Sequence, residues 1–171
     1  MNRYWNKMKL NQPIGKLLIM LLVLFNFGCD QLTKEVARTH ISEYERISVI
    51  KDHFTLLKVE NTGAFLSSGE SLPAPVKTIL LNILPLSAIF YGLYMLMKKN
   101  DFNLQMTLGI SLIVSGGLGN LYDRIRYGSV TDFMHLDFNI VQTGVFNVAD
   151  LFITAGVGLI LISIYSKKIA V

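Results

Sequence analysis

Four long apolar stretches constrain this chain more than any other feature of its sequence. Residues 78–97 and 102–122 carry no charged side chain, and residues 138–166 carry only Asp150. About 20 apolar residues in a helix cross a bilayer core of about 30 Å, so each of these stretches is long enough to span a membrane. The N-terminal stretch, residues 17–29, is shorter and needs extension at its ends. The chain is therefore predicted to be an integral membrane protein.

The composition is that of a membrane protein rather than a soluble domain. Hydrophobic residues make up 51% of the chain and charged residues only 16%, whereas soluble domains carry roughly 25% charged residues. The single cysteine, Cys29, excludes a disulfide within the chain and a multi-cysteine metal site. The apolar stretch before Cys29 also resembles a lipoprotein signal sequence, but Asn26 and Phe27 fit its cleavage motif poorly and three further apolar stretches follow.

The basic residues predict the orientation of the chain in the membrane. Eight of the 16 bases lie in residues 1–16, 98–101 and 167–168, which together hold one acid, while the other segments hold eight bases and eleven acids. By the positive-inside rule, both termini and the loop near Lys98 are cytoplasmic. The net charge of +4 thus reports topology, and no nucleic-acid partner is expected because the bases do not gather on one soluble face.

These patterns predict a mainly α membrane protein, a single domain over residues 1–171, with four transmembrane helices. The spans are expected at about residues 13–34, 77–97, 102–123 and 147–166, with Pro85 kinking the second. Between the first two, residues 47–50 and 54–59 suit strands and residues 51–53 suit a turn. We therefore expect a small extracytoplasmic β-cradle at about residues 40–75.

Two pairs of polar residues have the spacing of neighbours on a helix face. Asp30 and Lys34 are four residues apart at the outer end of the first span, and so are Asn120 and Arg124 at the outer end of the third. The members of each pair are predicted to share a face. The small residues just before Asn120 are interpreted as a surface for close helix contact.

Two acids lie where the surrounding sequence disfavours them. Asp150 is expected about one turn into the membrane, where a carboxylate costs on the order of 2.5–3.5 kcal/mol, and Asp132 precedes the same span on the same side. Two carboxylates held together share one proton, so that one acts as a base and the other as an acid, as in aspartic proteases. The alternative is structural, because Asn147 or Asp150 can cap the N-terminus of a helix.

Other chemistries have less support in the sequence. Asp132, His135 and Asp137 form a cluster with metal-ligand residue types, but the other two histidines are distant in sequence. Ser115 has no histidine near it in sequence to act as a base. A transporter would use the same acids as proton carriers, but no internal repeat is visible. We expect no metal and no cofactor.

Five short motifs resemble those of the bacterial lipoprotein signal peptidase family, signal peptidase II, in the family's order and spacing. They are Asp-Gln-Leu-Thr-Lys from residue 30, Asn-Thr-Gly-Ala-Phe from residue 61, Gly-Gly-Leu-Gly-Asn-Leu-Tyr-Asp-Arg from residue 116, Val-Thr-Asp-Phe from residue 130, and Phe-Asn-Val-Ala-Asp from residue 146. Thr131 stands where the family usually has valine. Residues 135–144 match no motif and are expected to form a variable loop.

The resemblance implies a set of site residues. It implies that Asp132 and Asp150 are the catalytic aspartates, and that Asn61, Asn120 and Arg124 line the substrate and inhibitor pocket. It also implies supporting roles at four further motif positions, which are Asp30, Lys34, Asp123 and Asn147.

The resemblance also implies an activity and a location. The family removes signal peptides from diacylglyceryl-modified prolipoproteins by cleaving before the lipidated cysteine, with water as the nucleophile and without a cofactor. Membrane lipids are expected as partners, and peptide-like inhibitors such as globomycin as ligands. The implied location is the bacterial cytoplasmic (inner) membrane, with the active site near its outer face. The non-enzymatic alternative is a membrane scaffold or transport subunit.

Overall fold

The computed structural model describes residues 13–51, 53–63, 72–98, 102–138 and 140–169. Several residues used in the sequence predictions lie outside this part of the chain. They are Arg3, Lys7 and Lys9 near the N-terminus, Ala64 and Phe65 of the second motif, and Lys99 and Asp101 in the short basic loop.

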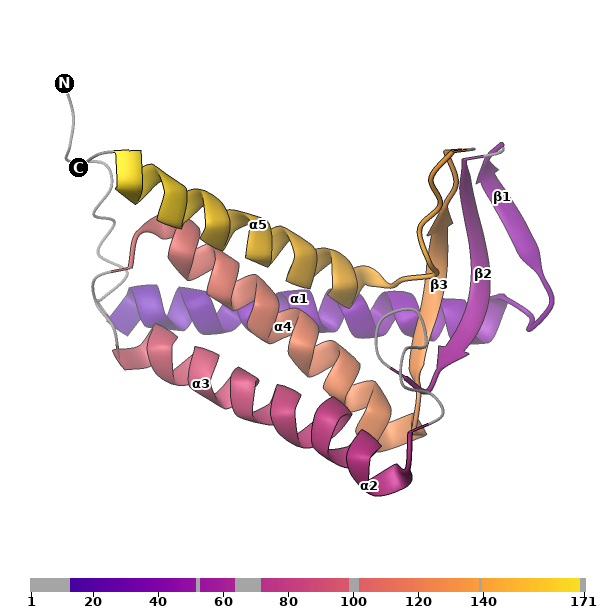
Figure 1. The fold of residues 1–171 in the computed structure, drawn as a ribbon, viewed down its shortest axis with the longest axis horizontal. Helices are drawn as coiled ribbons and strands as arrows, with labels where there is room; N and C mark the ends of the chain where they lie inside the picture. Colours follow the sequence, from indigo (N-terminus) through magenta and orange to yellow (C-terminus); the bar gives the residue numbers. More distant parts are fainter. Residues whose placement is uncertain (1–12, 52, 64–71, 99–101, 139, 170–171) are drawn as a thin grey trace.

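Within these described residues, four helical segments are long and apolar enough to cross a membrane, which confirms the predicted architecture. The first is α1 (Pro13–His40), the third is α4 (Leu104–Tyr127) and the last is α5 (Val148–Ile169). The second is composite, with α2 (Ala74–Lys77), η2 (Thr78–Ile83) and α3 (Leu84–Lys98) in succession. The helix α1 starts and α5 ends at one end of the bundle, and a small sheet lies at the opposite end (Figure 1).

The second helical segment changes its hydrogen-bond pattern just before Pro85. In η2 the turns widen to a π-helix, and the amide of Leu84 donates to the carbonyl of Ile79, five residues earlier. A proline lacks the amide donor and its ring crowds the preceding turn. The helix accommodates Pro85 with this wide segment, a form that is rare inside regular helices.

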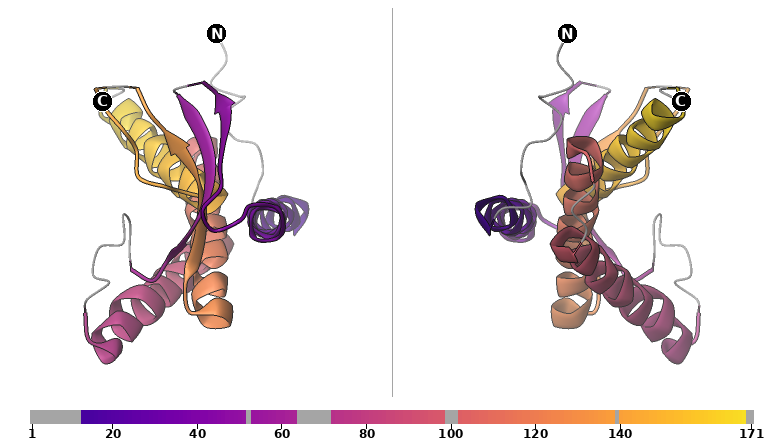
Figure 2. Two further views of the ribbon diagram at one scale, coloured as in Figure 1. Left: turned by 90° about the vertical axis from the view of Figure 1, so that its right-hand side faces the viewer. Right: turned by 90° about the vertical axis from the view of Figure 1, so that its left-hand side faces the viewer.

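The helix α4 is the centre of the bundle, since it packs against α5, α3 and α1. Seen end-on, α1 stands to one side of the other helices (Figure 2). Two glycines let α4 and α5 approach closely. A Cβ atom on Gly109 would lie 2.8 Å from the carbonyl oxygen of Gly156, and a Cβ on Gly156 would lie 2.6 Å from the carbonyl oxygen of Gly109. Small residues at a membrane helix contact have this effect.

The predicted small sheet is confirmed, but it has a strand that the sequence interpretation missed. Its order is β1 (Arg46–Ile50), β2 (Phe54–Asn61) and β3 (Val130–Leu136), all antiparallel. The third strand comes from between α4 and α5, so it includes the start of the segment predicted as a variable loop. Its first four residues are all buried, and a strand covered on both faces lacks the alternation that identifies half-exposed strands.

The first helix is also longer than expected. It continues to His40 rather than ending near Lys34, and its last turns pack against β3 and β2. Ala37 and Ile41 form a buried cluster with Phe133 of β3. The C-terminal end of α1 therefore attaches the sheet to the helix bundle.

The close contact of α4 with α5 gives a stability prediction with an internal control. We expect Gly156→Ala to destabilise the protein by about 1–3 kcal/mol, because the added methyl group collides with the backbone of α4. Gly158→Ala places its methyl group in open space on the same helix, so it is expected to be neutral or stabilising by up to about 1 kcal/mol. Unfolding of the purified variants in detergent measures both; equal stabilities would contradict this packing.

Candidate active site

The two acids singled out in the sequence lie on different elements and line one cavity. Asp132 is the third residue of β3, and Asp150 is in the first turn of α5. The cavity has a volume of about 240 Å³ and lies where the sheet meets the ends of the helices. Its lining consists of Asn61, Leu80, Leu81, Pro85, Asn120, Arg124, Val130, Asp132, Val145, Asn147 and Asp150.

Asp150 forms a capping box with Asn147 at the start of α5. The side-chain oxygen of Asn147 accepts a hydrogen bond from the amide of Asp150 at 3.1 Å, and the carboxylate of Asp150 accepts one from the amide of Asn147 at 3.2 Å. Each residue thus satisfies a helix-terminal amide through the other. The capping alternative raised by the sequence is therefore realised, and it orients the Asp150 carboxylate toward the cavity instead of competing with a role there.

Asp132 is nearly fully buried and is held by two amide side chains. Asn61 Nδ2 donates to one carboxylate oxygen at 2.9 Å, and Asn147 Nδ2 donates to the other at 2.6 Å. Burial raises the pKa of Asp132 to about 6; the hydrogen bond from Asn61 opposes this shift, and the nearby charge of Asp150 adds to it. Asp132 therefore changes its protonation state not far below neutral pH, a property that suits general acid–base chemistry.

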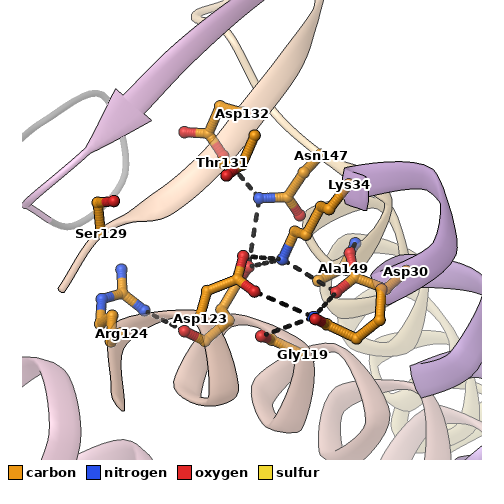
Figure 3. A network of polar contacts seen from close by, with 12 residues as sticks. Asp30, Lys34, Gly119, Asp123, Arg124, Ser129, Thr131, Asp132, Asn147 and Ala149 are labelled. Atoms are coloured by element: carbon orange, nitrogen blue, oxygen red, sulfur yellow. Dashed lines mark hydrogen bonds and ion pairs between the residues drawn. The ribbon is translucent and has the colours of Figure 1, made fainter. Parts of the chain in front are cut away.

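Beside the cavity, α1 and α4 enclose a charge cluster with Lys34 at its centre. Lys34 Nζ lies 2.9 Å from Asp30 and 3.0 Å from Asp123, and all three side chains are fully buried. Its third partner is the side-chain oxygen of Asn120, at 2.9 Å. Lys34 is therefore surrounded by two carboxylates and one amide oxygen. Figure 3 shows Lys34 reaching between the two carboxylates.

A second cation belongs to this cluster, and the sequence interpretation missed it. Arg38 Nη2 lies 3.0 Å from the carboxylate of Asp123, so two acids face two bases. Asp30, Lys34 and Arg38 are spaced four residues apart on α1, which places them along one helix face. That spacing is the signal by which Arg38 was recognisable.

Asp30 connects the charge cluster to the start of α5. One of its carboxylate oxygens accepts a hydrogen bond from the amide of Ala149 at 2.9 Å, so α1 supplies a further cap for this helix. The contact requires Gly119 on α4, because any Cβ atom there would collide with the Asp30 carboxylate. Gly119 therefore leaves room for the Asp30 carboxylate between α1 and α4, where this carboxylate also caps α5.

Asn120 joins the charge cluster to both aspartates. Its oxygen accepts hydrogen bonds from Lys34 and, at 3.2 Å, from Asn147 Nδ2, while its own Nδ2 donates to Asp150 at 2.9 Å. Asn147 Nδ2 also contacts Asp132. Lys34 therefore orients the Asn120 amide group by a hydrogen bond, and this amide group in turn orients the Asp150 carboxylate.

Arg124 stands at the wall of the cavity, one helical turn from Asn120. Its Nη2 donates to the carbonyl of Gly63 at 2.9 Å, and its buried Nε has no hydrogen-bond partner among the described residues. All nine residues implied by the family resemblance thus lie in the cavity or the adjoining cluster. By contrast, Asp132, His135 and Asp137 do not gather: the described chain holds no group of three potential metal ligands.

Together, the fold and the site define a class of protein, a multi-pass membrane protein with two acids in a cavity at one end of the helix bundle. A sequence model of signal peptidase II matches residues 21–166. The chain is 36% identical over 140 residues to the lipoprotein signal peptidase of Clostridioides difficile, covering 82% of this chain and 89% of that protein. It is 33% identical over 152 residues to that of Streptococcus pneumoniae, covering 89% and 95%.

A solved bacterial membrane enzyme has a similar fold, with a TM-score of 0.78, 28% sequence identity, and coverage of 88% of this chain and 89% of that one. A second solved bacterial membrane enzyme gives a TM-score of 0.74 at 28% identity, with coverage of 86% and 92%. This chain belongs to the signal peptidase II family, and is thus a membrane-embedded protease.

The charge cluster yields a prediction for Lys34. Lys34→Met leaves two buried carboxylates without their shared cation, so we expect a loss of about 3–5 kcal/mol in the free energy of unfolding. Lys51→Met, at an exposed position beyond β1, is the control and is expected to change stability by no more than about 0.5 kcal/mol. Denaturation in detergent micelles measures both. Similar stabilities for the two variants would show that the cluster does not depend on the lysine.

Proposed function

We propose that this protein removes signal peptides from diacylglyceryl-modified prolipoproteins, cleaving the peptide bond before the lipidated cysteine. The observation that carries the proposal is the pair Asp132 and Asp150, which face one cavity at the end of a membrane helix bundle. A scaffold, one non-enzymatic alternative, does not need a buried acid with a raised pKa. A transport subunit could use such acids as proton carriers, but the sequence shows no internal repeat of the kind that transporters contain.

The proposed mechanism is general acid–base catalysis by the two aspartates with water as the nucleophile. The pair holds one proton, because two close carboxylates do not readily ionise together. The ionised carboxylate removes a proton from water as its oxygen attacks the scissile carbonyl, and the protonated one donates to that carbonyl oxygen. In the second step, the aspartate that took the proton from water donates it to the amine nitrogen of the cysteine. The C–N bond breaks as the tetrahedral species collapses, and one of its hydroxyl groups returns a proton to the other aspartate, which restores the pair. The titration belongs to the pair.

Arg124 and Asn61 are proposed to bind the substrate around the reacting bond. Arg124 lines a cavity whose other polar residues include two acids, and its Nε has no hydrogen-bond partner within the described part of the chain. A fixed donor in such a site stabilises negative charge that develops on a carbonyl oxygen, or holds a lipid ester oxygen. Asn61 lines the same cavity and donates a hydrogen bond to Asp132, and we propose that it also binds backbone groups of the substrate.

One wall of the cavity suits the lipid part of the substrate. Leu80, Leu81 and Pro85 contribute apolar surface from η2 and the start of α3, next to helix faces of membrane-spanning composition. We propose that acyl chains of the diacylglyceryl group lie along this wall, so the substrate does not leave the bilayer. Peptide-like inhibitors of the family such as globomycin are proposed to occupy the same cavity.

The orientation of the protein is proposed from its charges and its fold. The helix α3 ends at Lys98, at the same end of the bundle as the start of α1 and the end of α5 (Figure 1). The end opposite the sheet therefore holds Lys16 of α1, Lys98 of α3, and Lys167 and Lys168 in the last turn of α5, and the positive-inside rule assigns this end to the cytoplasm. We propose a multi-pass protein of the bacterial cytoplasmic membrane, with cytoplasmic termini and the cavity near the outer face.

Conservative substitutions of the aspartates test the proposed chemistry. Asp132→Asn and Asp150→Asn keep the shape of each side chain but remove its ionisation, so we expect the rate of processing to fall at least about 10³-fold for each. Asp137→Asn, at the end of β3 and outside the cavity, is the matched control and is expected to process normally. The assay is gel or mass detection of a shortened diacylglyceryl-modified precursor. Retained cleavage by either aspartate variant would refute the dyad.

The raised pKa of Asp132 predicts the alkaline limit of activity. The pair must keep its proton, so kcat/KM is expected to fall above pH about 6, by about tenfold per pH unit. Because the hydrogen bond from Asn61 favours the charged carboxylate, Asn61→Leu raises the pKa of Asp132 and moves this limit to higher pH. A pH–rate profile gives the pH at which kcat/KM begins to fall separately from the maximum value of kcat/KM. A limit that stays in place, or moves to lower pH, contradicts the assignment.

A further inference from the structure

Behind the cavity, Thr131 joins three elements through one buried hydroxyl group. Arg38 Nε of α1 donates to Thr131 Oγ1 at 2.8 Å, and Thr131 Oγ1 donates to Glu60 Oε1 of β2 at 2.8 Å. Ser129 Oγ donates to the other carboxylate oxygen of Glu60. Thr131 has no solvent exposure, so both bonds matter: a buried hydroxyl group without partners is costly.

The bonds to Thr131 are on the opposite face of β3 from the cavity. Successive residues of a strand point to opposite faces, and Asp132 lines the cavity while Thr131 does not. Glu60 is the cross-strand partner of Thr131 in the β2–β3 ladder, and Val59 is the partner of Asp132. The hydroxyl–carboxylate bond therefore fixes the pairing immediately beside the Asp132 side chain.

This pairing lies next to an irregularity of the ladder. Leu56 pairs with Met134 and Val59 pairs with Asp132, so three steps along β2 match two steps along β3. A bulge of this kind interrupts the regular hydrogen bonds, and a slip of one residue moves every side chain of a strand to the other face. A slip here would turn Asp132 out of the cavity, and the Glu60–Thr131 bond opposes it.

The same chain of contacts reaches Asp150 through the charge cluster. The guanidinium of Arg38 stacks over the ring of Tyr127 at 4.1 Å and pairs with Asp123. Asp123 also pairs with Lys34, whose partner Asn120 donates to Asp150. Asp123 is thus linked to β3 through Arg38, and to Asp150 through Lys34 and Asn120.

We propose that Arg38, Thr131 and Glu60 are positioning residues that fix Asp132 relative to Asp150 for hydrolysis. None of the three lines the cavity, so they act through β3 rather than on the substrate. This inference rests on the proposed peptidase function of the cavity. It assigns a role to the threonine at the position where the family usually has valine.

Two substitutions at Thr131 separate the hydroxyl group from the shape of the side chain. Thr131→Val keeps the shape and removes both hydrogen bonds, so we expect kcat to fall on the order of 10- to 100-fold through misplacement of Asp132. Substrate contacts are unchanged, so KM is expected to stay within about twofold. Thr131→Ser keeps the hydroxyl group and is expected to retain kcat within about threefold of the original protein.

A second pair of variants decides the matter if Thr131→Val fails to fold. Glu60 is exposed, so its replacement perturbs the fold less. Glu60→Ala removes the acceptor of Thr131 and is expected to lower kcat on the order of tenfold with KM unchanged. Glu45→Ala, in the exposed segment before β1, is the control and is expected to leave both constants unchanged.

The assay uses the full-length purified protein and a diacylglyceryl-modified precursor, with detergent unfolding of each variant as a check. No cleavage by the original protein would overturn the proposed function. If that protein is active, a Thr131→Val variant with unchanged kcat would overturn the positioning role alone, and so would a Thr131→Ser variant as slow as Thr131→Val. If Thr131→Val does not fold, unchanged kcat in Glu60→Ala overturns the positioning role. A lowered kcat rescued by serine supports it.

Discussion

The ammonium group of Lys34 is in contact with two carboxylates and one amide oxygen inside the bundle, and the rest of the site is built outward from these contacts. Without Lys34, Asp30 would lose its paired cation and Asp123 would keep only Arg38, both in a region of low polarity. When Lys34 is present, its ion pairs join α1 to α4, and its hydrogen bond holds the Asn120 side chain in a single orientation. That orientation directs a donor to Asp150.

Structural and proposed catalytic roles coincide at the start of α5. Asp150 is both a member of the capping box and a cavity carboxylate, and Asn147 both caps the helix and contacts Asp132. A carboxylate at a helix N-terminus is favoured by the helix dipole, whereas Asp132 lies on a strand and has a raised pKa because of burial. Two acids in different environments suit the division into an acid and a base that hydrolysis by a dyad requires.

The four spans and the pairing of Asp30 with Lys34 could be predicted because apolar length and four-residue spacing are local signals. β3 could not, since its burial on both faces depends on elements far away in sequence. Arg38 had the right spacing but lay beyond the expected end of the first span, as the sheet supports six further residues of helix. The need for Gly119 became visible only once the carboxylate of Asp30 was placed against it.

Hydrolysis of a lipid-modified precursor in the cavity with Asp132 and Asp150 leaves two defined products. They can be identified by mass spectrometry after the purified protein is incubated with matched precursors with and without the diacylglyceryl group. We expect a free signal peptide and a polypeptide that begins with the lipidated cysteine, formed only from the modified precursor. Intact modified precursor, or cleavage at any other bond, would refute this function.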